Sequence, residues 1–347
     1  MTRRRALGSV STNAAASSAA SYVRAARAEP PAWHPCHIQR RSMLQVPSSH
    51  RSSSTYASAG PGYVSATAGA GAQAAAHVDI DAPTAHDPTQ FVEYVQDIYK
   101  HYRKDEVTKV ASPSYMAHQS DINEKMRAIL VDWLVEVHLK FKLMPETMFL
   151  TVNLIDRFLE RKLVARQKLQ LVGVTAMLLA SKYEEIYAPE VRDFVFITDR
   201  AYNREQILSM ESAMLTALGF NVTCPTALHF MNRFLKAARV ADETGRLKYL
   251  VRYYVERTMQ EYSMLKYLPS ITAAAAVNIA MRSLGLGTWD ATLTAYTGFT
   301  EAQLQPCVQD MEHILEYAPT ANLQAVRKKY SSSRYREVAK VPLVRMQ

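Results

Sequence analysis

The feature that most constrains the fold is a long succession of helical segments between Pro88 and Ala318. Apolar residues recur there at helical spacing, which predicts an all-α fold. The expected helices cover about residues 89–104, 121–142, 145–159, 167–186, 189–197, 203–218, 225–239, 243–262, 269–284, 290–297 and 300–316.

Local signals mark several helix ends. Asp121, with Glu124 three residues later, fits the capping-box pattern and is expected to begin the second helix. Pro145 opens the third, because the N–H that proline lacks would have no partner in a first turn. Gly219 suits the left-handed position that commonly follows a helix.

The helices fall into two halves with related patterns. Each half contains a helix that is apolar on nearly all sides, at about 167–186 and at 270–284, as is typical of a central helix. The fifth helix opens with Tyr202-x-x-x-Gln206-Ile207 in one half and Phe299-x-x-x-Gln303-Leu304, 97 residues later, in the other. Two tandem five-helix units are the simplest account. The alternative is one long bundle with a coincidental similarity.

Four regions follow from this pattern. Residues 1–87 form an Ala/Ser/Arg-rich tail, 88–222 an N-terminal helix plus the first unit, 223–318 the second unit, and 319–347 a C-terminal extension. Residues 1–85 show no sustained period, and their burial could not offset an ordering cost of about 1–2 kcal/mol per residue. We therefore expect that segment to be disordered.

Composition excludes several classes of protein. The three cysteines, Cys36, Cys224 and Cys307, are far apart, which argues against a disulfide scaffold or a zinc site and for a reducing compartment. There is no run of 18 apolar residues, so no membrane span is expected. The 262 residues after the first 85 hold 33 basic and 29 acidic side chains, which lacks the basic footprint of a nucleic-acid-binding domain.

The sequence also contains no arrangement of residues typical of catalysis. We find no Ser/His/Asp set, no phosphate-binding glycine loop and no cluster of metal ligands. The chain is therefore expected not to be an enzyme, and no cofactor is predicted.

The segment from Met126 to His138 is an amphipathic helix with two apolar faces. Leu134 and Val137 are expected to point into the core. A second stripe, at i, i+3, i+4 and i+7, consists of Met126, Ile129, Leu130 and Trp133. Periodicity alone favours further core packing for this stripe.

This segment resembles the cyclin-box signature of A- and B-type cyclins. The resemblance covers about residues 88–340 and continues through segments 153–159, 168–173, 178–186, 267–270 and 329–330. Residues 138–141 and 145–147 resemble B-type more than A-type cyclins. The resemblance implies two tandem cyclin boxes and a non-catalytic subunit that binds and activates a cyclin-dependent Ser/Thr protein kinase at G2/M, in the nucleus and cytoplasm.

The resemblance also implies a kinase-binding site. Lys182 and Glu211 would clamp the kinase, although neither has an oppositely charged neighbour at i+4. Apolar contacts would surround this pair, at Tyr183, Leu215, Phe220 and Val222. The family usually has an aromatic contact where this chain has His101, and the neighbouring Tyr99 and Tyr102 could replace it.

A second implied site is a docking patch for Arg-x-Leu segments of substrates and inhibitors. Its residues are Met126, Ile129, Leu130, Trp133 and Gln170, with Glu136 placed to receive the arginine. The resemblance thus turns the apolar stripe from a core face into an exposed binding face.

The tail allows two interpretations. Arg4 and Leu7 resemble a destruction box read by the mitotic ubiquitin ligase, but the asparagine of that pattern is one residue late, at Asn13. Arg41 and Leu44 form a weaker second candidate. The alternative is an organellar transit peptide, since the first 78 residues contain one acid.

A different functional class, a cyclin-fold nucleic-acid-binding adaptor, would be distinguished by failure to co-purify with a kinase.

Overall fold

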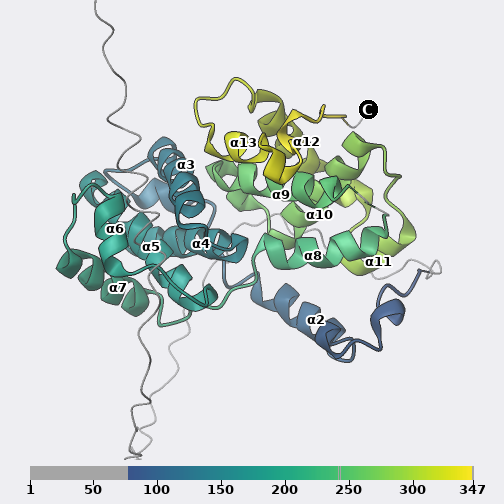
Figure 1. Ribbon diagram of the computed structural model, residues 1–347, viewed down its shortest axis with the longest axis horizontal. Helices are drawn as coiled ribbons and strands as arrows, with labels where there is room; N and C mark the ends of the chain where they lie inside the picture. Colours follow the sequence, from purple (N-terminus) through teal and green to yellow (C-terminus); the bar gives the residue numbers. More distant parts are fainter. Residues whose placement is uncertain (1–76, 241, 243, 346–347) are drawn as a thin grey trace, which may run out of the picture. The chain divides into compact units, whose positions relative to one another are not determined.

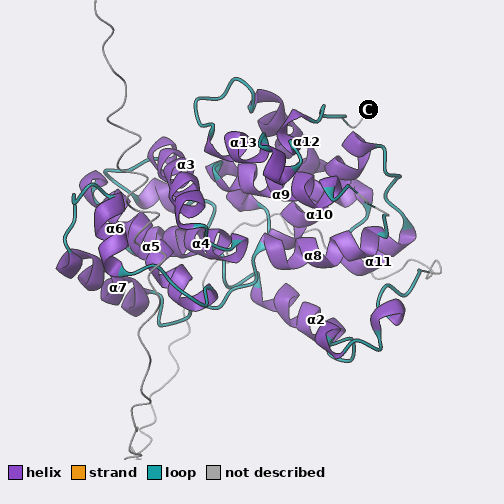
Figure 2. Ribbon diagram, in the orientation of Figure 1, coloured by secondary structure: helices purple, strands orange, loops and turns teal. Residues whose placement is uncertain are grey.

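The computed structural model describes residues 77–240, 242 and 244–345, and every regular element in those ranges is helical (Figure 1, Figure 2). The expectation of an all-α fold is confirmed. An N-terminal helix, α2 (Val95–Asp105), precedes two five-helix units, which we call the first and second box.

The first box consists of α3 (Glu124–Phe141), α4 (Pro145–Arg161), α5 (Leu169–Glu184), α6 (Val191–Ile197) and α7 (Arg204–Ala217). The second consists of α8 (Ala227–Ala238), α9 (Arg246–Met259), α10 (Pro269–Leu284), α11 (Ala291–Thr297) and α12 (Glu301–Tyr317). A short helix, α13 (Ala325–Tyr330), follows. Every helix expected from periodicity is present, with most ends within three residues of the predicted ones.

Two helix starts differ from the prediction. The cap of α3 is Asn123, whose side chain accepts a hydrogen bond from the Met126 N–H at 3.0 Å. Asp121 is not the cap, because its carboxylate pairs instead with Arg166, with 2.7 Å between Oδ1 and Nε. The first helix starts at Val95 rather than near residue 89, because Phe91 has a φ of +50° and interrupts helical geometry.

The central helix of each box is buried along most of its length. In α5, Gly173 allows close approach of α3, since a Cβ there would lie 2.7 Å from Leu130 Cδ1. In α10, the run Ala273–Ala276 is fully buried. Small side chains let α8, α9 and α12 pack against α10. Because α5 and α10 are each surrounded by other helices, their sequences are apolar on nearly all sides.

A buried ion pair joins the two boxes. Arg127 on α3 donates two hydrogen bonds to Asp156 on α4, at 2.6 and 2.7 Å, and the Tyr115 hydroxyl donates to the same carboxylate at 2.8 Å. Arg127 Nη1 also donates to the Met259 carbonyl at 3.0 Å, at the end of α9. One side chain therefore links α3 and α4 of the first box to the second.

A second buried cluster incorporates the C-terminal extension into the core. Glu256 on α9 is fully buried and accepts hydrogen bonds from Lys329 at 2.6 Å and from the Tyr330 hydroxyl at 2.5 Å. Burial raises the pKa of Tyr330 well above its ordinary value, so the hydroxyl remains a donor. Because α13 also packs against α3, the extension contacts both boxes.

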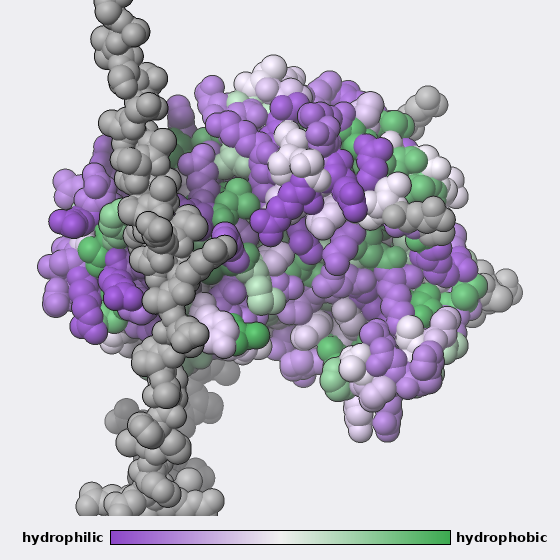
Figure 3. All heavy atoms as spheres, viewed as in Figure 1, coloured by the Kyte–Doolittle hydropathy of each residue, from purple (hydrophilic) through white to green (hydrophobic). Residues whose placement is uncertain are grey.

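The surface visible in Figure 3 is mostly hydrophilic, with apolar residues in small separate groups. Across the described ranges, the helices are too short or too polar to cross a lipid bilayer. Within the same ranges, no three or more His, Cys, Asp and Glu side chains are grouped to hold a metal ion.

Candidate functional site

Lys182 and Glu211, far apart in sequence, form an ion pair on the surface of the first box. Lys182 lies in the last turn of α5 and Glu211 in the middle of α7, with 2.6 Å between Nζ and Oε1. The lysine side chain is 47% exposed and the glutamate 14%. Both side chains therefore reach solvent while they form an ion pair with each other. A partner could replace the internal contact of either one.

Exposed apolar side chains flank this ion pair. Tyr183 is 51% and Phe220 71% exposed, and the Tyr183 hydroxyl lies 2.6 Å from Thr223 Oγ1. Phe220 has a φ of +56°, an unusual conformation for a bulky residue, and it directly follows Gly219, also at positive φ. Leu215 and Val222 are half-buried and pack against the core. Of the four predicted apolar contacts, two are thus clearly available to a partner.

Two further apolar residues on this surface were missed by the sequence interpretation. Ile186 is 88% and Tyr187 92% exposed, directly after the end of α5. The sequence interpretation places Ile186 at the end of the helix expected over 167–186, whereas α5 ends at Glu184 and leaves both residues in the loop before Pro189. We call the set Lys182, Tyr183, Ile186, Tyr187, Glu211 and Phe220 the α5–α7 surface.

The base of this surface is held by carboxylates. Glu185 accepts hydrogen bonds from the Met144 N–H at 2.7 Å and from the Thr147 hydroxyl, which fixes the chain just before Ile186. Burial raises the pKa of Glu184, and the negative charges of Glu146 and Glu185 raise it further. A cation from a partner would relieve this crowding of negative charge.

The aromatic residues of α2 make contacts with the second box. The Tyr99 hydroxyl donates to the His229 carbonyl at 3.0 Å, and the Tyr102 ring packs edge-on to His229 at 5.2 Å. Both residues thus contact the second box, and their replacement of the usual aromatic contact at His101 stays a prediction. The exposed apolar residues in and just before α2 include Phe91 at 63%, Tyr94 at 58% and Ile98 at 36%.

The predicted docking patch is divided by the fold. Ile129 is 49% exposed and Glu136 is exposed, whereas Met126 and Trp133 are half-buried against the core. Leu130 is only 6% exposed, because Gly173 on α5 lets it pack inward, and its assignment to an exposed patch is wrong. Gln170 is half-buried one turn before Gly173, on the side of α5 that meets α3.

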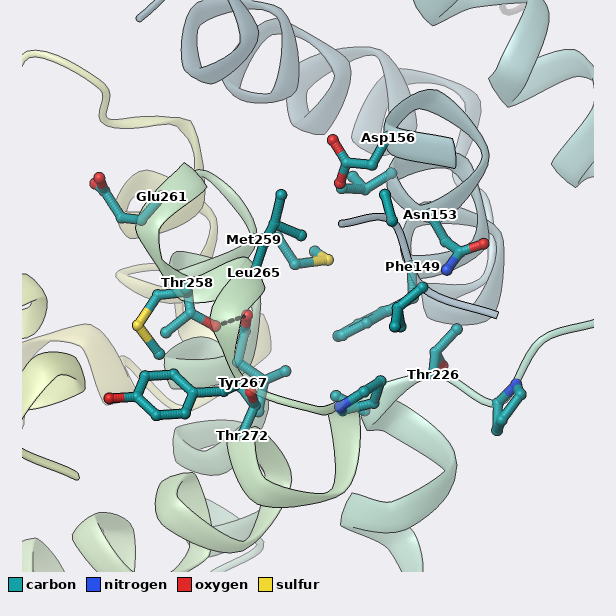
Figure 4. A pocket seen from close by; sticks show the side chains of 18 of the residues that line it. Phe149, Asn153, Asp156, Thr226, Thr258, Met259, Glu261, Leu265, Tyr267 and Thr272 are labelled. Atoms are coloured by element: carbon teal, nitrogen blue, oxygen red, sulfur yellow. Dashed lines mark hydrogen bonds between the residues drawn. The ribbon is translucent and has the colours of Figure 1, made fainter. Parts of the chain in front are cut away.

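A cavity of about 120 Å³ lies between the boxes (Figure 4). Figure 4 shows Phe149, Asn153 and Asp156 on one side and Thr258, Met259 and Thr272 on the other. Its polar side chains already have partners within the chain, as Asp156 binds Arg127, Asn153 donates to the Lys109 carbonyl and Thr258 donates to the Val255 carbonyl. The cavity therefore belongs to the packing of the box junction, and the α5–α7 surface is the better candidate.

The tail residues proposed as degrons, Arg4 with Leu7 and Arg41 with Leu44, lie outside the described residues. The structure therefore places the predicted kinase-binding and docking residues but not the degradation signal.

The site thus consists of a surface ion pair with an apolar rim, on the first of two tandem five-helix boxes. Residues 97–223 match the family Cyclin, N-terminal domain, and residues 225–343 match the family Cyclin, C-terminal domain. The chain belongs to the cyclin family. Because cyclins are regulatory subunits rather than catalysts, this membership supports the prediction that the chain is not an enzyme.

The relatives indicate the branch of the family. The chain is 52% identical over 263 residues to G2/mitotic-specific cyclin-1 of Medicago sativa subsp. varia, which covers 76% of this chain and 61% of that protein. It is 49% identical over 264 residues to Cyclin-B2-1 of Oryza sativa subsp. japonica, with 76% and 62% covered. The resemblance to mitotic, B-type cyclins is thereby confirmed. The chain spans about three fifths of the length of these relatives.

A solved structure agrees with the fold. A viral cyclin from herpesvirus saimiri superposes with a TM-score of 0.58 at 16% identity, covering 62% of this chain and 96% of the viral one. At that identity the likeness concerns the fold alone, and it supports the two-box architecture.

Proposed function

We propose that this chain binds and activates a cyclin-dependent Ser/Thr protein kinase that acts at the G2/M transition. The observation that supports the proposal most directly is the α5–α7 surface, where an ion pair lies beside the highly exposed Ile186 and Tyr187. Similarity to relatives named G2/mitotic-specific supports the timing.

In this mechanism, the kinase replaces the internal partner of each charged residue. Lys182 would donate to backbone carbonyls of the kinase, and Glu211 would accept from backbone N–H groups. Charge-assisted hydrogen bonds contribute about 1.5–3 kcal/mol each, but breaking the internal ion pair offsets part of that gain. The apolar rim would supply the rest of the binding free energy, because buried aromatic anchors usually dominate interface energy.

Activation would work by stabilising one kinase conformation over another. Moving a kinase from 1% to 99% competent requires about 5.5 kcal/mol of differential binding. The favoured conformation would be the one with the kinase's own Lys–Glu ion pair assembled. The cyclin would contribute no reacting group to the chemistry.

Co-purification with a kinase catalytic subunit, followed by a histone phosphorylation assay, tests the proposal. We expect the Lys182→Ala/Glu211→Ala double variant to lose both binding and activation, by about 100-fold or more. The matched control is Asp121→Ala/Arg166→Ala, which removes another exposed ion pair of the first box and should leave both unchanged. Wild-type binding by the first variant would contradict the proposal.

We further propose that the exposed part of the α3 stripe recruits substrates with Arg-x-Leu segments. Ile129 and Trp133 would contact the leucine, and Glu136 the arginine. Trp133→Ala should weaken phosphorylation of docking-dependent substrates while kinase binding persists. Because Trp133 packs against the core, Ile129→Ala is the cleaner second variant. Equal loss of kinase binding and docking would reject this division of labour.

Residence in the nucleus and cytoplasm, and destruction through Arg4 and Leu7 by the mitotic ubiquitin ligase, are further proposals. A fluorescent fusion would test both. We expect nuclear and cytoplasmic signal that disappears at mitotic exit, and an Arg4→Ala/Leu7→Ala variant that persists. Co-localisation with mitochondria would favour the transit-peptide interpretation instead.

A further inference from the structure

Residues 77–84, which we call the N-terminal latch, lie on the second box although they belong to the segment expected to be disordered. The Val78 N–H donates to Thr292 Oγ1 at 3.3 Å, and the Ile80 N–H donates to the Tyr296 hydroxyl at 3.2 Å. Both acceptors are on α11. Ile80 is only 5% exposed, so the latch buries an apolar side chain as well as satisfying backbone groups.

The next residue, Asp81, enters a pocket of positive charge. Its carboxylate accepts two hydrogen bonds from Arg233, both at 2.6 Å, and one from Lys236 at 2.9 Å. Both cations are on α8, and Asp81 is 5% exposed. A buried carboxylate is tolerated only where its charge is matched this closely, so the contact is specific for an acidic side chain.

Aromatic rings from two other helices hold Arg233 in this pocket. Arg233 is held between two rings, 5.5 Å from the centre of Tyr99 on α2 and 4.9 Å from that of Tyr296 on α11. Lys236 also donates to the Thr84 hydroxyl at 2.9 Å, which fixes the end of the latch. Three helices therefore orient the cations that bind Asp81.

The same arginine connects the latch to α2. Tyr99, which packs against Arg233, donates a hydrogen bond from its hydroxyl to the His229 carbonyl on α8. Docking of Asp81 thus neutralises a buried charge directly beside the contact that holds α2. Loss of that carboxylate would leave Arg233 uncompensated at the junction of α2 with α8.

We propose that the groove between α8 and α11 is a docking site for a short apolar–acidic peptide, and that its occupant is this chain's own Val78-x-Ile80-Asp81 segment. Docking fixes the point at which the preceding tail leaves the second box, and it holds α2 against α8. The docking itself is independent of any kinase. The role of the latch in holding α2 is likewise independent of the function proposed above.

Hydrogen–deuterium exchange on the full chain tests the docking. In the wild type, the amides of Val78 and Ile80 should exchange far more slowly than in a free peptide. Asp81→Asn should accelerate exchange at these two amides by on the order of 100-fold, because Arg233 loses its counter-charge, while amides of α10 keep their rates. The matched control is Glu93→Gln, which removes an exposed carboxylate near α2 and should change neither set.

A labelled peptide of residues 76–85 tests the groove directly. It should bind the Asp81→Asn chain at least tenfold more tightly than the wild type, whose groove is already filled by a tethered copy. The same peptide with asparagine in place of Asp81 should not bind. In the exchange experiment, two results would overturn the docking of the latch. One is that Val78 and Ile80 of the wild-type chain exchange as fast as in a free peptide, and the other is that Asp81→Asn accelerates exchange in α10 equally.

Two outcomes separate the latch from the proposed function. If Asp81→Asn opens the latch but leaves the exchange rates of the α2 amides unchanged, the role of the latch in positioning α2 is overturned while the docking site stands. If Lys182→Ala/Glu211→Ala leaves kinase binding intact, the proposed function fails, and the exchange result is unaffected.

Discussion

The two boxes share one helical plan but use the corresponding first helix in opposite ways. In the first box, α3 leaves Ile129 49% exposed and Trp133 half-buried, so its outer side is open to solvent. In the second box, α8 is covered by α2 and by the N-terminal latch, through Tyr99 and Asp81. The repeat therefore preserves the core while the surfaces diverge: the outer side of α3 is open to solvent, and that of α8 is covered by the chain's own N-terminal segments.

The boxes also differ in how they bury charge, and the largest expected effects test that difference. Asp156→Ala in the first box should destabilise the chain by about 3–5 kcal/mol, because Arg127 is 1% exposed and guanidinium groups stay charged. Urea denaturation measures this loss. Asp121→Ala, which breaks an exposed pair, should cost about 1 kcal/mol or less. Similar losses for both would contradict the ranking.

The equivalent change in the second box should cost less. Glu256→Ala leaves Lys329, which is 2% exposed, but an unpaired buried lysine can lose its proton and so avoid a buried charge. We expect a loss of about 2–4 kcal/mol by the same measurement. If this variant were less stable than Asp156→Ala, the distinction between arginine and lysine clusters would be wrong.

The divided face of α3 provides the next test. Leu130→Ala should cost about 2–4 kcal/mol, because it opens a cavity against Gly173, whereas Ile129→Ala should cost under about 1 kcal/mol. Thermal or urea unfolding of the two variants gives the comparison. Equal losses would mean that Ile129 belongs to the core and not to a binding surface.

His138 in the first box is buried and His229 in the second is half-buried, and the smallest expected effect depends on pH. Burial lowers the pKa of His138 in the first box and of His229 in the second. The unfolded chain then binds protons more readily than the folded one, so stability is full above the ordinary histidine pKa of about 6.5 and falls as the pH drops below it. The slope should not exceed about 1.4 kcal/mol per pH unit for each histidine.

Urea denaturation at a series of pH values checks this dependence. His138→Gln should flatten the slope, whereas the control His86→Gln removes an exposed imidazole and should keep the parent profile. An unchanged slope in His138→Gln would show that other groups cause the acid sensitivity.

Periodicity was sufficient to predict the helices, because each buries a face whose spacing is visible in the sequence. It failed where a distant residue competed for a local role. Asp121 looked like a helix cap, but Arg166, 45 residues later, binds its carboxylate. Leu130 looked like part of an exposed stripe, but it packs into the core, because Gly173 on α5 has no Cβ that would clash with it.

The candidate site shows the same limit. The resemblance identified Lys182 and Glu211, but no local spacing could show that they pair across α5 and α7. Ile186 and Tyr187 were missed because the expected helix extends to residue 186, whereas α5 ends at Glu184 and leaves both side chains in an exposed loop. The latch was missed because Asp81 is stabilised by Arg233, 152 residues away.

The Lys182–Glu211 ion pair has a consequence for the ionic-strength dependence of binding. Because the two charges neutralise each other before a partner arrives, the exposed clamp presents a dipole rather than a net charge. Long-range steering by this pair then contributes little, and added salt screens the internal pair and its replacement contacts alike. The pair itself should therefore add little salt dependence to association, and its selectivity would depend on a partner that offers an acceptor and a donor together, at the spacing of this pair.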